Sequence, residues 1–139
     1  MTLTPGLAAT VVLVVGAADL APAHRSGDVP VLATPRLLAL CEEATVAAVA
    51  ARLGPGETTV GTRVELAHLA PSPTGTEVTA TALLEEIVGR RLVFAVTARR
   101  GEVPLADGRI ERLVVDRAGF LRRAEARDEA LPTAARPAG

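Results

Sequence analysis

Two adjacent carboxylates, Glu42 and Glu43, interrupt a stretch of the chain that is otherwise almost entirely apolar. Between positions 37 and 51, all the remaining residues are Leu, Ala, Val, Cys or Thr. A carboxylate buried in such surroundings is costly unless a partner pairs with it, so at least one of the two has a functional interpretation. The structural alternative, in which both stand where the segment meets solvent or a second subunit, is equally open. Successive side chains of a helix point about 100° apart, so only one of the pair can face a given site.

His68 supplies an imidazole to the segment that follows. Alternation places it on the more apolar face of a predicted strand, together with Val60, Thr62, Val64 and Leu66. A lone histidine in such a position is more often a satisfied structural residue than a catalyst. If a helical carboxylate reached the ring, it would orient the imidazole and stabilise its protonated form, which is the arrangement used in base catalysis.

Thr34, at the start of the apolar stretch, has two interpretations. Because it precedes Pro35, it is a good helix N-cap. Its hydroxyl is also a candidate nucleophile or a positioning group for a substrate. A continuous helix rises about 12 Å between positions 34 and 42, so Thr34 and Glu42 cannot hydrogen-bond directly. Cys41 is expected to pack as a small hydrophobic residue, because no cation nearby would activate its thiol.

The pattern of the chain predicts the elements that must position these residues. A helix is predicted over 34–54, with Pro35 in its first turn and Gly54 just past its end. A loop is predicted over 19–32, and strands over 7–18, 60–69, 77–87, 92–99 and 109–116. Short connections between the last four strands favour antiparallel pairing. The predicted class is α+β, with one helix on the concave face of a sheet. Because the helix is apolar on all sides, a dimer is expected to complete its cover.

Composition limits the function further. The 139 residues suit one domain, and the net charge of −1 with 1% aromatic residues gives no basis for binding nucleic acid. One cysteine excludes an internal disulfide and suits a reducing cytoplasm, and one Cys with two His argues against a structural zinc site. The apolar run 7–18 is too short to span a membrane and lacks the basic start of a signal peptide. Neither a Walker nor a GxGxxG pattern occurs, and no cofactor is expected.

The region from Thr34 onward resembles the hotdog-fold thioesterases of the fluoroacetyl-CoA thioesterase type. In that family a Thr, a Glu eight residues later and a His twenty-six beyond that form the catalytic constellation, and Thr34, Glu42 and His68 fall at these spacings. The Ala-Thr before the helix, the Gly-Thr of the next strand, the Ala-His-Leu around the histidine and the later Gly-Arg-Arg-Leu hairpin also match. The resemblance extends over roughly 11–120.

The resemblance implies a hotdog domain over 1–121, in which an antiparallel sheet of about five strands wraps around one long central helix. The charged, Ala/Pro-rich residues 122–139 are expected to form a poorly ordered tail. The family implies a homodimer, with tetramers left open, that hydrolyses an acyl-CoA or acyl-carrier thioester entering at the subunit interface. It selects Glu42 over Glu43 and assigns Thr34, Glu42 and His68 to catalysis without a metal. The alternative is a non-catalytic hotdog domain that binds an acyl thioester or a partner protein.

The chain departs from the family pattern in the loop before Thr34. The fluoroacetyl-specific enzyme carries phenylalanines there as a lid over the acyl group, whereas this loop has Arg25 and Asp28 and no aromatic residue. Fluoroacetate specificity is therefore not expected, and aliphatic side chains are expected to line the acyl pocket.

Overall fold

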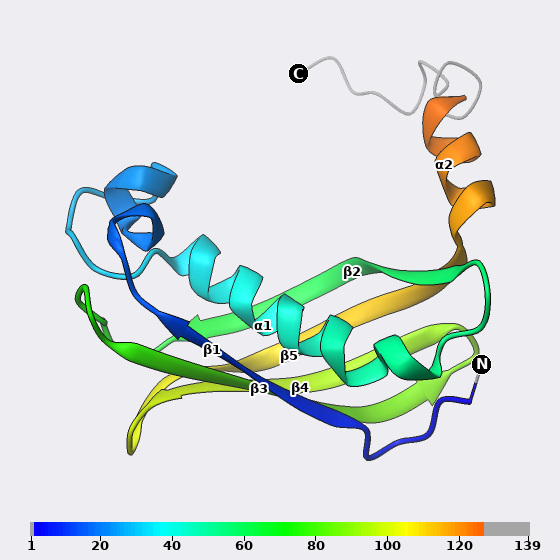
Figure 1. Ribbon diagram of the computed structural model, residues 1–139, viewed down its shortest axis with the longest axis horizontal. Helices are drawn as coiled ribbons and strands as arrows, with labels where there is room; N and C mark the ends of the chain where they lie inside the picture. Colours follow the sequence, from blue (N-terminus) through cyan, green and yellow to red (C-terminus); the bar gives the residue numbers. More distant parts are fainter. Residues whose placement is uncertain (1, 127–139) are drawn as a thin grey trace.

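The structure, a computed structural model, describes residues 2–126. The helices are α1 (Thr34–Val49) and α2 (Arg117–Glu125), and the strands are β1 (Ala8–Val14), β2 (Glu57–His68), β3 (Glu77–Val88), β4 (Arg91–Arg100) and β5 (Val103–Asp116). The strands form one antiparallel sheet in the order β1-β3-β4-β5-β2, which curves around α1 (Figure 1). The predicted α+β architecture, with five strands and one central helix, is confirmed.

The core lies between α1 and the concave face of the sheet. Buried side chains recur on α1 at spacings of three and four, as at Leu37, Leu40 and Ala44, so they line one face of the helix. Phe94 on β4 is the largest fully buried side chain opposite them. Removing this aliphatic surface from water is the main force that holds the helix on the sheet.

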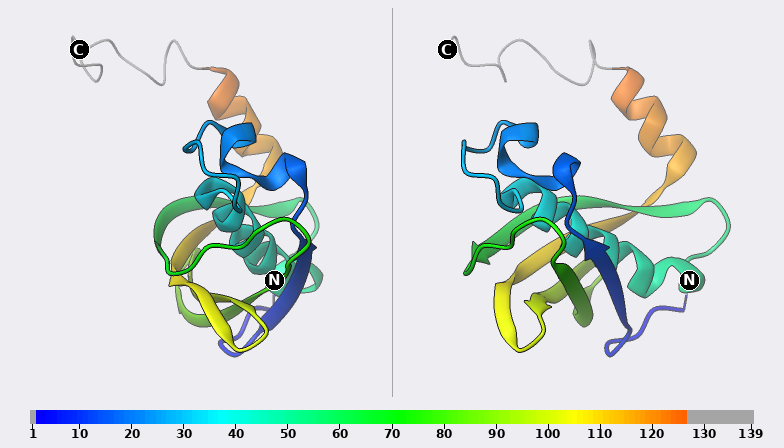
Figure 2. Two further views of the ribbon diagram at one scale, coloured as in Figure 1. Left: turned by 90° about the vertical axis from the view of Figure 1, so that its left-hand side faces the viewer. Right: turned by 60° about the vertical axis from the view of Figure 1, so that its left-hand side comes forward.

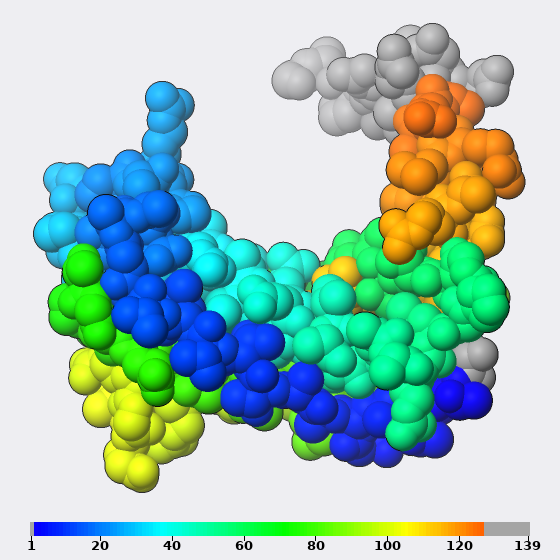
Figure 3. Space-filling view, viewed as in Figure 1, coloured from blue at the N-terminus to red at the C-terminus, as the bar shows by residue number. Residues whose placement is uncertain are grey.

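One side of α1 remains exposed, although the sequence predicted burial all round. Ala39, Val46 and Ala47 face solvent in the single chain, and Val46 is 43% exposed. Figure 3 shows that the molecule is hollowed above α1, between the segment that follows β1 and the projecting α2. An apolar helix face at the bottom of a hollow is a surface suited to a partner.

Several predicted element ends differ from the structure. β1 ends at Val14 rather than at residue 18, and β2 begins at Glu57 rather than at residue 60. The helix ends in a 3-10 turn over Ala50–Arg52, and Gly54 does not adopt the expected left-handed conformation. β5 begins at Val103, although a turn was predicted over 101–108. Gly108 marks a close approach of two strands rather than a turn, because a Cβ there would collide with the backbone of β2.

α2 projects away from the sheet at the end of β5 (Figure 2). Asp116 caps it, with its carboxylate accepting a hydrogen bond from the Gly119 N–H at 2.8 Å. The helix continues past residue 121, where the sequence placed the start of a poorly ordered tail, and residues 127–139 of that tail lie outside the described residues. No helix within residues 2–126 is long and apolar enough to cross a membrane.

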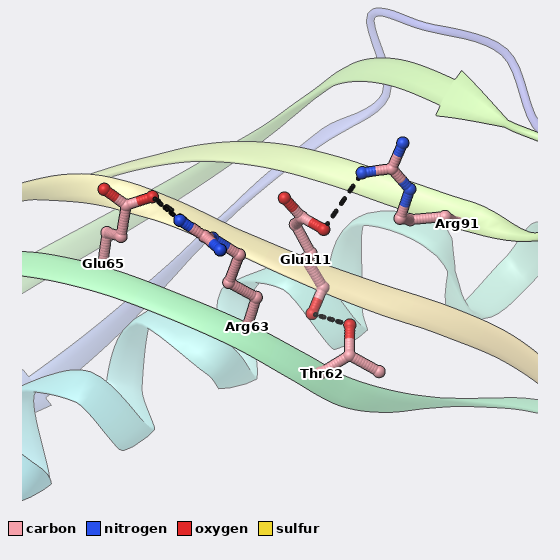
Figure 4. A network of polar contacts seen from close by, with 5 residues as sticks. All are labelled: Thr62, Arg63, Glu65, Arg91 and Glu111. Atoms are coloured by element: carbon pink, nitrogen blue, oxygen red, sulfur yellow. Dashed lines mark hydrogen bonds and ion pairs between the residues drawn. The ribbon is translucent and has the colours of Figure 1, made fainter.

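A β-bulge interrupts β2 at Thr62. Gly61 pairs with Arg112 on β5 and Arg63 pairs with Glu111, so Thr62 is an extra residue without a partner in the ladder. Its hydroxyl donates to the backbone carbonyl of Glu111 at 3.2 Å, which ties the bulge to β5 (Figure 4).

The bulge reverses which residues of β2 face the helix. Beyond it, Val64, Leu66 and His68 pair with inward positions of β5 and point toward α1, as the alternation predicted. Before it the parity is opposite, so Gly61 faces the helix and Val60 faces outward, contrary to the prediction for Val60.

Candidate active site

Thr34 and His68 lie together although they are far apart in the chain. Thr34 is the first residue of α1, and His68 is the last residue of β2. The turn after α1 sends β2 back along the helix, so the end of β2 lies beside the start of α1 (Figure 1). Thr34 Oγ1 and His68 Nδ1 are 2.7 Å apart and form a hydrogen bond. Thr34 is exposed and His68 is half-buried, so a ligand at the surface has access to both.

The hydroxyl of Thr34 does not cap α1, and the predicted N-cap role is wrong. The N-cap position belongs to Ala33, which has no capping side chain, and Thr34 is already inside the helix. The backbone fixes Ala33 instead, because its N–H donates to the Asp19 carbonyl at 2.9 Å and its carbonyl accepts from the Leu37 N–H at 2.9 Å. The Thr34 hydroxyl is thereby left for His68.

The imidazole tautomer decides what this hydrogen bond can do. With the ring proton on Nε2, the Thr34 hydroxyl donates to His68 Nδ1, and the ring can take the proton when the oxygen attacks a carbonyl carbon. With the proton on Nδ1, the ring donates to the Thr34 oxygen and keeps Nε2 as an acceptor. The first arrangement is that of a nucleophile with its general base.

Glu42 lies further along α1 and pairs with an arginine. Because α1 is continuous, a rise of about 12 Å separates Glu42 from Thr34 along its axis. Glu42 Oε2 accepts a hydrogen bond from Arg112 Nη1 at 3.3 Å. Within residues 2–126 Glu42 has no hydrogen bond or ion pair with His68, so the contact considered from the sequence does not form in the single chain. The neighbouring Glu43 is exposed, whereas Glu42 is half-buried and hydrogen-bonds to Arg112.

Sequence reasoning missed Arg112, which is only 7% exposed. It shares its side of β5 with the buried Ile110 and Val114, and an arginine at an inward position of an alternating strand was the available signal. Thr59 on β2 fixes the guanidinium, which donates from Nε to Thr59 Oγ1 at 2.9 Å and from Nη2 to its carbonyl at 3.0 Å. Burial lowers the pKa of Arg112, and the Glu42 carboxylate offsets part of that effect.

A shallow, open apolar depression of about 250 Å³ lies beside His68 and is lined by Val31, Leu69, Ala70 and Pro71. Its lining is aliphatic apart from His68 itself. A larger hollow of about 550 Å³ lies over β2, β4 and β5 and contains none of the three predicted site residues, so volume alone does not mark the site.

The outer face of the sheet carries ion pairs. Arg63 pairs with Glu65 at 3.1 Å, and Arg91 pairs with Glu111 at 3.2 Å (Figure 4). Exposed pairs of this kind contribute at most about 1 kcal/mol each, and they describe a solvated surface. The candidate chemistry therefore lies on the helix side of the sheet.

Cys41 is buried in α1, in agreement with its predicted packing role. Burial raises the pKa of its thiol to about 11, which removes it as a nucleophile at neutral pH. In the part of the chain that the structure describes, no three His, Cys, Asp or Glu side chains are grouped so that they could hold a metal ion.

The curved antiparallel sheet that wraps around one long helix defines a hotdog-fold protein. A sequence model of the FlK family, described as fluoroacetyl-CoA-specific thioesterase, matches residues 15–118, so the chain belongs to this family. The fluoroacetyl-CoA thioesterase of Streptantibioticus cattleyicolor is 41% identical over 85 residues. That alignment covers 61% of this chain and 61% of the enzyme, which is less than two thirds of either.

Solved structures agree with this family. The fluoroacetyl-CoA thioesterase FlK superposes with a TM-score of 0.83 at 31% identity, covering 91% of this chain and 98% of that one. A serine-for-threonine variant of FlK in complex with acetyl-CoA gives 0.84 at 30% identity, covering 91% and 99%. A hot-dog-like protein from Thermanaerovibrio acidaminovorans gives 0.82 at 28% identity, covering 89% and 92%. The family and the hotdog fold expected from the sequence are confirmed.

Proposed function

We propose that this protein hydrolyses an acyl-CoA, or a related acyl thioester, to a free acid and a thiol. The observation that carries the proposal is the 2.7 Å hydrogen bond between Thr34 Oγ1 and His68 Nδ1 beside an apolar depression. Family membership supports the substrate class, because the family and its curated relative are both named for a thioester of CoA.

Thr34 and His68 act on the thioester carbonyl. The Thr34 oxygen attacks the carbonyl carbon while His68 takes its proton, and the C–S bond breaks. The imidazole returns the proton to the sulfur, which leaves as a thiol. Water then attacks the Thr34 ester, which releases the acid and restores the hydroxyl. The partial positive charge at the start of α1 favours the oxyanion of both steps.

Glu42 acts on the attacking water as a general base. The helical rise of about 12 Å keeps its carboxylate away from the Thr34 hydroxyl, which leaves space for a water and the ester between them.

The acyl group is aliphatic, and fluoroacetyl is not preferred. The depression beside His68 has an aliphatic lining, and Arg25 and Asp28, in the loop before α1, are both exposed. Across a panel of acyl-CoAs, the rate with fluoroacetyl-CoA is expected not to exceed that with acetyl-CoA. A strong fluoroacetyl preference would contradict this assignment.

The functional unit is a homodimer, in the cytoplasm. β2 is an edge strand with one row of backbone N–H and C=O groups unpaired in the single chain, and the exposed side of α1 lies under the hollow of Figure 3. A second copy pairing along β2 would cover both surfaces and bring the site to the subunit boundary. The free Cys41 suits a reducing compartment. Sedimentation equilibrium tests the dimer, and a monomer at assay concentration would overturn it.

The central experiment measures free thiol released from a panel of acyl-CoAs. The wild type is expected to turn over at least one aliphatic thioester, and Glu42→Gln to lose about 10³-fold in kcat while remaining folded, with a lowered melting temperature because the buried Arg112 loses its charged partner. Glu43→Gln is the matched control, because its carboxylate is exposed and is expected to be dispensable. Saturable binding without thiol release from any acyl-CoA would favour the non-catalytic alternative.

A further inference from the structure

α2 rises from the sheet with little of its surface buried. Within Arg117–Glu125 only Gly119 is buried, and Leu121 is 52% exposed. A helix of nine residues has little stability of its own, because most of the stability of a short helix comes from packing an apolar face on a neighbour. α2 therefore needs a further packing surface, which residues 2–126 of the same chain do not supply.

The apolar side chains of α2 stand over the free edge of β2. Phe120 and Leu121 line a hollow of about 240 Å³ together with three consecutive residues of β2, at positions 58–60. Consecutive side chains of a strand point to opposite faces, so a hollow that touches all three lies along the edge of the strand. That edge is unpaired in the single chain, because β2 is the outermost strand on its side of the sheet.

α2 and the Thr34–His68 pair lie at opposite ends of β2. Asp116, which precedes α2, pairs with Glu57 at the start of the strand, and His68 is the last residue of the strand. At about 3.3 Å per residue the two ends are roughly 35 Å apart, so α2 cannot reach the site of its own chain. In Figure 3 α2 bounds one end of the hollow above α1, and the segment that leads to Thr34 bounds the other end.

A second copy of the chain brings these two ends together. When an edge strand pairs with its own copy about a two-fold axis that keeps both α1 helices on one side of the sheet, the two strands run antiparallel. The start of one β2 then lies beside the end of the other. α2 of one subunit thereby stands against the partner's His68 and the depression beside it, which is shallow and open in the single chain.

We propose that α2 of each subunit closes the acyl site of the other subunit, with Phe120 and Leu121 as the outer apolar wall. The depression is aliphatic apart from His68, so this contact removes apolar surface of both subunits from water. The ligand against this wall is the aliphatic acyl chain of the thioester, which a closed pocket covers more fully than an open depression. The inference rests on the proposed function, because it assumes the dimer along β2 and thioester hydrolysis beside His68.

The first experiment removes the wall and measures kcat/KM with a series of acyl-CoAs. Phe120→Ala combined with Leu121→Ala is expected to lose about 10²-fold in kcat/KM, with the largest loss for the longest acyl chain, because each lost side chain removes apolar contact. Val12→Ala combined with Val14→Ala is the matched control, since these side chains are 56% and 59% exposed on β1, at the opposite edge of the sheet. Wild-type kcat/KM in the α2 variant would overturn the inference.

Mixed dimers show which subunit supplies α2. One chain carries Thr34→Ala, the other chain carries the two α2 substitutions, and two affinity tags isolate the mixed dimer. If α2 acts on the other subunit, the chain with Thr34 receives an intact α2, and about half the wild-type rate is expected, because one of two equivalent sites is complete. The reciprocal dimer places all three substitutions in one chain opposite a wild-type chain and is expected to be nearly inactive. The opposite pattern of rates would contradict the inference.

A cross-link tests the contact without measuring activity. Leu121→Cys combined with Leu69→Cys places one thiol on α2 and another in the depression, at opposite ends of β2 within one chain. A short bis-maleimide is expected to join two subunits in this variant and in neither single cysteine variant, because the native Cys41 is buried. Absence of a covalent dimer would overturn the inference, and this result decides even if the alanine variant of α2 fails to fold. A covalent dimer, together with a wild type that releases no thiol, would instead overturn the proposed function alone.

Discussion

Replacement of Thr34 by alanine separates the two interpretations of this residue. If its hydroxyl capped α1, the loss would cost about 1 kcal/mol of the free energy of unfolding. In the structure Thr34 stands inside the helix, where alanine is a better helix former by up to about 0.7 kcal/mol. Loss of the hydrogen bond to His68 costs about 0.5–1.5 kcal/mol. The two terms oppose each other, so the expected net change is a few tenths of a kcal/mol.

The same substitution is expected to remove activity. Without the oxygen 2.7 Å from His68 Nδ1, the imidazole has no hydroxyl to activate, and kcat is expected to fall by about 10³-fold. Thr34→Ser keeps the hydroxyl and is expected to keep most of the turnover. The assays are thiol release and thermal unfolding, in which 1 kcal/mol corresponds to about 4 °C for a domain of this size. Thr10→Ala is the control, because it removes another exposed threonine hydrogen bond, to Thr81 at 3.0 Å.

Two outcomes would refute this reasoning. Wild-type kcat in Thr34→Ala would remove the hydroxyl from the chemistry. A melting temperature lowered by 4 °C or more, with Thr34→Ser fully stable, would restore the capping role that the structure assigns to the backbone of Ala33.

Two further predictions concern groups outside the reaction. Cys41, with a thiol pKa of about 11, is expected to react with a disulfide reagent at pH 8 only as the protein unfolds, and rapid labelling of the native protein would contradict its burial. The Gly16 N–H, with a smaller contribution from Arg36, lowers the pKa of Asp19 below its usual 3.8. Because the folded pKa is the lower one, this stabilisation is present above pH 3.8 and is lost as the pH falls further. The difference in unfolding free energy between the wild type and Asp19→Asn should therefore shrink on acidification, and urea titrations that show a constant difference would contradict it.

Local patterns predicted most of the fold. The strands predicted over 77–87 and 92–99, with the short connection at Gly89-Arg90, correspond to the hairpin that β3 and β4 form. The start of β5 was missed because Pro104 and Gly108 are typical of turns. In the structure Pro104 pairs at an irregularity of the β4–β5 ladder, and Gly108 lies where two strand backbones approach closely. Both features depend on neighbouring strands, which a local pattern does not contain.

The candidate site was predictable only in part. Spacing selects Thr34, Glu42 and His68, and their catalytic roles remain predictions, although the structure does bring Thr34 and His68 together. The partner of Glu42 was sought in an imidazole and is instead Arg112, seventy residues away. That contact depends on β5 lying between β4 and β2, which is a property of the sheet order. Residue types and spacing therefore indicated the candidate functional groups, but they did not indicate Arg112, the charged residue that pairs with Glu42.

The bulge at Thr62 satisfies two requirements that regular alternation cannot meet together. Gly61 and His68 are seven positions apart, so on a regular strand they would face opposite sides of the sheet. His68 must face α1 to reach Thr34, and Gly61 must face α1 to leave room for the Glu42 carboxylate. The extra residue changes the parity between them and turns both toward the helix. One irregularity in one strand thereby lets β2 support both groups of α1, the hydroxyl at its start and the carboxylate in its middle.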